Sequence, residues 1–140
     1  LAVARGGAGN MIEFDVSVSG KHIDRLRGDG FVVSTATGST GYALASGGPI
    51  VTPEFTGMVC VPIAPHTLHS RAVVTAPSDV VEMDLSENQD DRDATLFIDG
   101  ELVELDRPLR RLYVRRGDVP TTLLRYKDEG FYNHAAKVFF

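Results

Sequence analysis

Residues 11–18 read MIEFDVSV, and this stretch sets the pattern for much of the chain. Apolar side chains occupy every second position, at Ile12, Phe14, Val16 and Val18, with polar side chains between them. A period of two is typical of a strand that buries one face and exposes the other. The stretch therefore predicts a half-buried β-strand.

The same alternation returns further along the chain. Residues 81–85 place Val, Met and Leu on one face and Glu and Asp on the other. Residues 94–98 and 101–105 are strand-like and are separated only by Asp99-Gly100. An Asp-Gly pair between two strands favours a two-residue type I′ turn, because both turn positions need positive φ. We therefore predict a tight hairpin.

Short apolar runs at 31–33 and 112–114 also predict strands, and helical signal is sparse. Residues 39–46 favour a short helix that ends at a Gly-Gly-Pro stop, and residues 131–139 carry apolar side chains at helical spacing. The polar residues 89–93 predict an exposed loop. Many short strands with one or two short helices predict an all-β, sandwich-like domain of layered sheets.

Composition limits the classes of partner. The 140 residues carry a net charge of −5, which disfavours binding to nucleic acid or to an anionic membrane. No stretch approaches the length of a transmembrane helix, and the first residues lack the basic-then-apolar pattern of a secretion signal, so we expect none. The single cysteine, Cys60, has apolar neighbours, so we expect a buried, inert thiol in a reducing, cytoplasmic compartment. The arginines between 107 and 116 favour a solvated strand face.

The residues with chemical potential lie at 34–42, which read STATGSTGY. A strand that enters a glycine turn and a helix N-terminus presents backbone N–H groups suited to a phosphate or a ribose hydroxyl. Thr37, Ser39 or Thr40 can cap that helix, and Gly38 lets a ligand approach the backbone. Tyr42 adds a flat ring and a hydroxyl group. From composition alone, an ordinary turn remains the alternative interpretation.

Beyond composition, the order of blocks is informative. Residues 28–49, GDGFVVSTATGSTGYALASGGP, resemble the signature of NAD kinases. Residues 62–68, PIAPHTL, followed by Arg71, resemble a second block of the same family. Residues 11–14 and the Asp99-Gly100 hairpin also lie where the family places them. The resemblance covers nearly the whole chain.

This resemblance implies that residues 1–140 are the C-terminal domain of an NAD kinase, behind a separate catalytic α/β domain. Such enzymes transfer a phosphoryl group from ATP, or in some members polyphosphate, to the 2′-hydroxyl of the adenosine ribose of NAD. Mg²⁺ would accompany ATP. The family's Gly-Gly-Asp-Gly loop and Asn-Glu pair lie in the first domain, and residues 27–30 only superficially resemble that loop. We therefore expect no catalytic residue in this chain and no kinase activity from it alone.

The resemblance also implies roles for individual residues. Asp29 would contact the bound dinucleotide across a subunit interface of a homodimer or homotetramer. Thr37, Thr40 and Gly41 would line the adenosine side of the pocket, and Tyr42 would pack near the nucleotide and hydrogen-bond to it. Gly41 stands where the family usually has Ala, and this replacement predicts a helix loosened by roughly 1 kcal/mol.

A second departure, two alternative functions and one candidate metal site remain. Ala36 stands where the family usually has Pro, which removes a rigid φ ahead of the glycine turn. The alternative functions are the C-terminal domain of a diacylglycerol or sphingosine kinase and a non-catalytic nucleotide-binding or oligomerisation module. His66 and His69 raise the possibility of a metal site, but no further ligand stands at suitable spacing, so we expect none.

Overall fold

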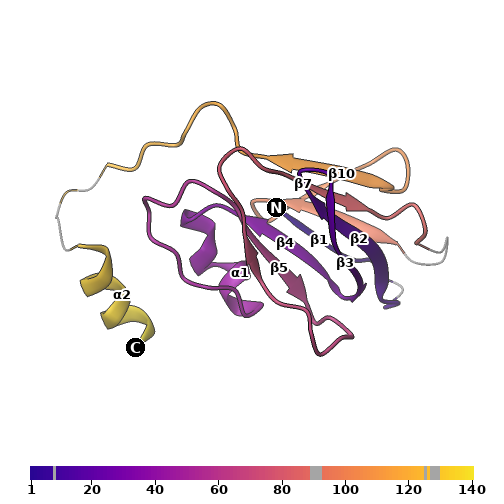
Figure 1. Cartoon of the computed structure of the whole chain (residues 1–140), viewed down its shortest axis with the longest axis horizontal. Coiled ribbons are helices and arrows are strands. Elements are labelled where there is room, and N and C mark those ends of the chain that lie inside the picture. The colour runs from indigo at the N-terminus through magenta and orange to yellow at the C-terminus, as the bar shows by residue number, and fades with distance from the viewer. Residues whose placement is uncertain (8, 89–92, 125, 127–129) are drawn as a thin grey trace.

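The chain folds into two antiparallel β-sheets with few helices (Figure 1). The computed structural model describes residues 1–7, 9–88, 93–124, 126 and 130–140. The strands are β1 Ala2–Arg5, β2 Ile12–Val18, β3 Lys21–Gly28, β4 Gly30–Ser34, β5 Val59–Ile63, β6 Val73–Val74, β7 Val80–Asp84, β8 Ala94–Ile98, β9 Glu101–Val103 and β10 Arg111–Arg115. The helices are the 3₁₀ helix η1 Thr37–Thr40, α1 Tyr42–Ala45 and α2 Phe131–Phe139. The six-stranded sheet has the order β6-β5-β4-β1-β8-β9, and the four-stranded sheet has the order β10-β7-β2-β3. The predicted mainly-β, sandwich-like fold is confirmed.

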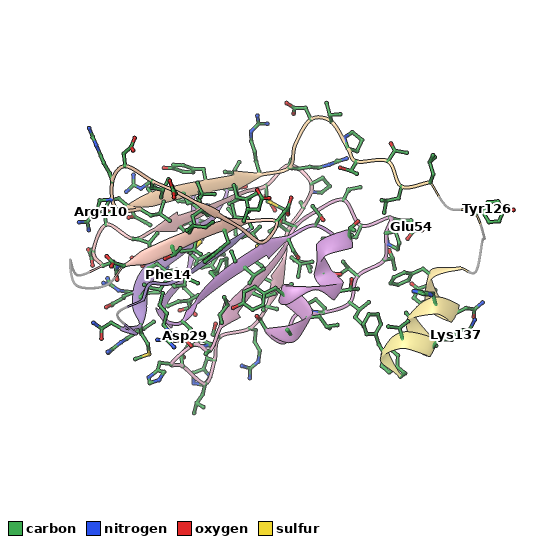
Figure 2. All side chains as sticks on the ribbon, turned by 180° about the vertical axis from the view of Figure 1, so that it is seen from behind. Phe14, Asp29, Glu54, Arg110, Tyr126 and Lys137 are labelled. Carbon is green, nitrogen blue, oxygen red and sulfur yellow. The ribbon has the colours of Figure 1, made fainter. Side chains whose placement is uncertain are left out.

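The main core lies between the two sheets. The alternating residues Ile12, Phe14 and Val16 of β2 are all buried there. They pack against side chains of the six-stranded sheet, and the rings of Phe14 and Phe31 meet edge-to-face with centroids 5.9 Å apart. Phe14 is labelled between the layers in Figure 2. The period of two in the sequence is thus the direct result of one face of β2 being covered by another sheet.

A second, smaller core covers the outer face of the six-stranded sheet. Val32, Val59 and Val61 point outward from β4 and β5 and are buried together with Ala43 of α1. Figure 1 shows α1 against this side of β4 and β5. Because both faces of β4 are covered, its sequence is a continuous apolar run rather than an alternating one.

Two tight turns set the register of neighbouring strands. Asp99 and Gly100 have φ values of 50° and 88°, so the hairpin predicted between β8 and β9 is confirmed with positive φ at both positions. Ser19 and Gly20, with φ values of 48° and 75°, join β2 to β3 in the same way.

Several elements differ from the sequence-based prediction. The helix expected at 39–46 is divided into η1 and α1, which are separated at Gly41. β9 ends at Val103, before the predicted end at residue 105. The C-terminal helix α2 forms as predicted over Phe131–Phe139 and lies apart from the sheets (Figure 1). The loop predicted at 89–93 lies outside the described residues except for Asp93, which is exposed.

Candidate functional site

A cavity of about 1090 Å³ lies where β4 ends and η1 begins. One wall is formed by residues 34–38 together with Gly41 and Tyr42. The other walls come from β1, the loop 53–58, the β8–β9 turn and the segment that follows β10. Segments far apart in the sequence therefore converge on one hollow whose volume lies near the upper end of the range for small-molecule sites.

Hydroxyl groups fix the local shape of residues 34–42. Oγ1 of Thr35 accepts a hydrogen bond from the Gly38 N–H at 3.3 Å. Ser39 is fully buried, and its Oγ donates to the Ala36 carbonyl at 2.7 Å. Oγ1 of Thr40 donates to the Thr37 carbonyl at 3.3 Å. These short-range bonds explain why so many hydroxyl residues occur in one tight segment.

The predicted capping is wrong in detail. Neither η1 nor α1 has a side-chain cap, and α1 begins at Gly41 as its N-cap residue. The N–H groups of Gly38, Ser39 and Gly41 already donate to Thr35 Oγ1, the Ala36 carbonyl and the Gly38 carbonyl. Backbone donors of the glycine turn are therefore used within the turn, and α1 has only four residues. A ligand would meet mainly side chains and the surface of the turn.

The position of Gly41 also changes an expectation. We expected Gly41 to loosen a helix relative to Ala, but it lies at the junction of η1 and α1 rather than inside a helix. Glycine is better tolerated than alanine at an N-cap, so the interior penalty does not apply here.

The structure brings Thr37, Gly41 and Tyr42 together on the cavity wall. Tyr42 is 53% exposed, so its ring is available to a ligand. Thr40 is adjacent in sequence and exposed, but it does not line the cavity.

Asp29 lies away from this group. It precedes β4, whereas the cavity residues follow β4, and a five-residue strand spans about 17 Å. Its carboxylate Oδ1 lies 2.9 Å from Nε of Arg5, and its position is labelled in Figure 2. Within one chain, Asp29 therefore does not reach the cavity that Tyr42 lines.

Sequence reasoning missed part of the lining. Phe55 and Phe97 contribute apolar surface, and Asp99, Arg115 and Arg116 contribute charge. The Asp99-Gly100 turn carried a local signal, which predicted its conformation rather than its location. The arginine cluster at 107–116 was interpreted as a solvated strand face, although Arg115 and Arg116 line the cavity. The other residues reach the cavity through long-range sheet pairing, which short motifs do not encode.

Two buried groups near the end of β4 have no ionised or hydrogen-bonded partner in the described chain. The Ser34 hydroxyl group is buried with no hydrogen-bond partner in the described chain, although Ser34 lines the cavity. An unsatisfied buried hydroxyl group of this kind is uncommon in a folded protein. Cys60 is buried, as predicted, and burial raises the pKa of its thiol to about 12, so it remains protonated near neutral pH.

No metal site is formed by the side chains that the structure describes. Among these residues, no group of three or more His, Cys, Asp or Glu side chains is arranged to hold an ion. His66 instead donates its backbone N–H to the Arg27 carbonyl at 2.7 Å.

Comparison with known proteins identifies the family. The model of the ATP-NAD kinase C-terminal domain matches residues 1–126. The chain belongs to this family. The NAD kinase of Nitrosospira multiformis is 40% identical over 136 residues, which are 94% of this chain and 44% of that protein.

Solved NAD kinase structures share the fold. An NAD kinase from Archaeoglobus fulgidus, crystallised in complex with ATP, superposes with a TM-score of 0.80 at 29% identity, over 97% of this chain and 51% of that chain. Yeast NADH kinase, complexed with NADH, superposes with a TM-score of 0.73 at 28% identity, over 83% of this chain and 33% of that chain.

These matches have a limited span. The chain covers 46% of the Thermoanaerobacter NAD kinase and 44% of the Nitrosospira enzyme, so it corresponds to less than half of such relatives.

The match to the ATP-NAD kinase C-terminal domain confirms the resemblance found in the sequence and does not favour the lipid kinase alternative. In the described part of the chain, no helix is long and apolar enough to cross a bilayer.

Proposed function

We propose that the complete protein is an NAD kinase and that this domain holds the NAD acceptor. The reaction transfers a phosphoryl group from ATP, or from polyphosphate, to the 2′-hydroxyl of the adenosine ribose. The observation that carries the proposal is the cavity at the end of β4, where Thr37, Gly41 and Tyr42 of the family signature lie on one wall. The relatives that match the chain are named NAD kinases, which supports the same activity.

The cavity offers contacts suited to an adenosine group. The half-exposed ring of Tyr42 provides a flat apolar face for the base, and its hydroxyl group can hydrogen-bond to the nucleotide. Gly41 has no side chain, so this wall leaves space for a ligand. A Cβ atom at residue 41 would meet only the Gly38 carbonyl oxygen, at 3.5 Å. Thr37 adds a polar group beside Gly41 and Tyr42. Thr40 supports this wall through its hydrogen bond to the Thr37 carbonyl.

In this proposal the chain positions the NAD acceptor and does not transfer a proton. A ribose held against residues 37–42 presents its 2′-hydroxyl to a donor bound elsewhere, and fixing two reactants in this way removes much of the entropic barrier. No residue of the chain is assigned as the catalytic base. ATP, its Mg²⁺ ion and the base belong to a separate N-terminal α/β domain in this proposal. The isolated chain is then a binding domain without kinase activity.

Asp29 takes part across a subunit interface in this proposal. It precedes β4 and lies at the opposite end of that strand from the cavity of its own chain, so a homodimer or homotetramer would bring it to the dinucleotide of a neighbouring subunit. Edge strands β6 and β9 leave unpaired backbone groups that favour association of this kind. We also propose a cytoplasmic location, which agrees with a single reduced cysteine.

Calorimetric titration of the chain with NAD tests the proposal. We expect saturable binding that Tyr42→Ala weakens at least tenfold, because the main stacking surface is lost. Tyr126→Ala is the matched control, since Tyr126 is 99% exposed and does not line the cavity. Binding that is equally affected by both variants, or absent in the unaltered chain, would contradict the assignment of the acceptor site to this domain. Formation of NADP by the purified chain would contradict its predicted inactivity.

A further inference from the structure

Few charged side chains line the cavity. Among the described residues that line it, only Asp99, Arg115 and Arg116 carry charged side chains. The charge of Arg115 is offset by its ion pair with Asp118. Arg116 is therefore the lining cation that is left to attract an anion.

The arginines near β10 differ in what they contact. Arg111 forms ion pairs with Glu82 and Asp84 on the outer face of the four-stranded sheet. Nη1 of Arg115 lies 3.4 Å from Oδ1 of Asp118. Arg116 has no hydrogen-bond or ion-pair partner within the part of the chain that the structure describes.

The direction of Arg116 follows from the alternation of β10. Leu112 and Val114 pack against the core between the sheets, whereas Arg111 and Arg115 are exposed on the opposite side. Arg116 continues the positions of Leu112 and Val114, and it follows the end of the strand, where the sheet no longer covers it. Arg116 lines the cavity, and no carboxylate in the described part of the chain pairs with it.

We propose that Arg116 binds the phosphate groups of the nucleotide that occupies this cavity. A guanidinium group donates paired N–H bonds to phosphate oxygens and keeps its charge at all working pH values. Tyr42 would hold the adenosine at one wall and Arg116 the phosphates at another. The inference rests on the proposed function, and it adds a phosphate contact outside the signature segment. The phosphates are either the pyrophosphate of NAD or the phosphate chain of a donor, which the N-terminal domain would hold and which Arg116 would contact from this domain.

Two probes and matched variants test this assignment. The chain is titrated with NAD and with inorganic tripolyphosphate, as the unaltered protein and as Arg116→Gln, Arg116→Lys and Arg107→Gln. Arg107 is the control because it is also exposed and unpaired in the described chain, lies outside this cavity and gives the same change in net charge. We expect Arg116→Gln to weaken binding about tenfold, as for a lost charge-assisted hydrogen bond. Arg116→Lys should recover part of that loss, and Arg107→Gln should change binding less than twofold.

The pattern of losses identifies the phosphate. Weakened NAD binding alone assigns Arg116 to the acceptor's pyrophosphate, weakened tripolyphosphate binding alone assigns it to donor phosphates, and loss of both assigns it to phosphate in general. Equal effects of Arg116→Gln and Arg107→Gln overturn the inference, as does an unaltered chain that binds neither probe. NAD binding that depends on Tyr42, while neither NAD nor tripolyphosphate binding depends on Arg116, overturns the inference and leaves the proposed function standing. Tripolyphosphate binding that depends on Arg116, in a chain that does not bind NAD, supports the inference and contradicts the proposed function.

Discussion

Oδ1 of Asp29 lies 2.9 Å from Nε of Arg5, and the same two residues share a backbone hydrogen bond from the Arg5 N–H to the Asp29 carbonyl at 2.8 Å. The pair joins the end of β1 to the start of β4. The side chains are 40% and 38% exposed, so solvent screens much of their attraction. This ion pair therefore contributes little to the stability of the fold.

Replacement of Asp29 by Ala tests this separation. We expect the free energy of unfolding in urea to fall by less than about 1 kcal/mol, as is usual for an exposed ion pair. NAD affinity should fall only at protein concentrations where the chain self-associates, because the aspartate would serve a neighbouring subunit's cavity. Calorimetry at two protein concentrations, with sedimentation velocity beside it, measures both effects. A loss of affinity in the monomer would contradict the cross-subunit role.

Gly57 is a site where a single methyl group should be severely destabilising. A Cβ atom there would lie 1.9 Å from the Thr75 carbonyl oxygen. The neighbouring Met58 N–H donates a hydrogen bond to Thr75 Oγ1, and the Met58 carbonyl accepts one from the Thr75 N–H. We expect Gly57→Ala to lower the free energy of unfolding by about 3 kcal/mol, because backbone atoms must separate. Thermal and urea unfolding measure this loss.

The matched control for Gly57 is Gly7→Ala, since nothing lies within 4 Å of a Cβ atom at residue 7. That variant should stay within about 0.5 kcal/mol of the unaltered chain. Because the loop 53–58 forms one wall of the cavity, Gly57→Ala should also weaken NAD binding in the fraction that remains folded. Equal stability of the two variants would show that the β5–β6 region is looser than its hydrogen bonds indicate.

Gly41→Ala should be tolerated. The nearest atom to an added Cβ would be the Gly38 carbonyl oxygen at 3.5 Å, which is an ordinary van der Waals contact. Since Gly41 is an N-cap rather than an interior helix residue, we expect no gain in stability from alanine. NAD affinity should change less than threefold, or about 0.6 kcal/mol, as measured by the same calorimetric titration. A gain of about 1 kcal/mol would restore the original helix-interior interpretation of this position.

Cys60 should resist alkylation while the chain is folded. Burial raises the pKa of its thiol from 9.0 to about 12, so almost no thiolate exists at pH 8. Iodoacetamide should modify the protein in 6 M urea but not in buffer, as read by mass spectrometry. Rapid modification of the folded chain would show that β5 opens readily.

The same pKa shift predicts how stability depends on pH. Below pH 9 the thiol is protonated in both states, so its contribution is fully present. Between pH 9 and about 12 the unfolded state loses its proton first, and stability should fall by roughly 1.4 kcal/mol per pH unit from this group. Comparison with Cys60→Ala, which lacks the ionising thiol, separates this slope from that of other groups. Identical slopes for the two proteins would contradict the shift.

The sequence predicted those parts of the fold that produce a recognisable pattern within a short stretch of residues. β2 and β7 bury one face each, so their alternation is visible, and the Asp99-Gly100 hairpin follows from turn chemistry. β3 was missed because only Leu26 and Gly28 are buried, and the rest of its pattern is polar. β1 was missed because its four residues carry no period and are held by distant partners.

The sequence likewise predicted only those residues of the candidate site that belong to a local motif. Thr37, Gly41 and Tyr42 belong to one short segment whose composition and family resemblance mark it, and the structure keeps them together. Arg116 reaches the cavity only because β10 joins the second sheet, and no motif surrounds it. The family resemblance assigned Asp29 to the dinucleotide across a subunit interface, and in its own chain the strand β4 separates it from the cavity.

The placement of β1 has a consequence for how the chain folds. Ala2–Arg5 lies between β4 and β8, and its register pairs Val3 with Phe31 on one side and with Leu96 on the other. The six-stranded sheet cannot be completed until β1 pairs with β8, whose residues lie about ninety positions away in the sequence. Pairing between residues so far apart slows folding. During synthesis β4 emerges from the ribosome well before β8, so the edge of β1 that pairs with β8 stays unpaired until β8 has been made. A chaperone that shields this edge, or a permuted chain that joins β1 directly to β8, should raise the yield of folded protein.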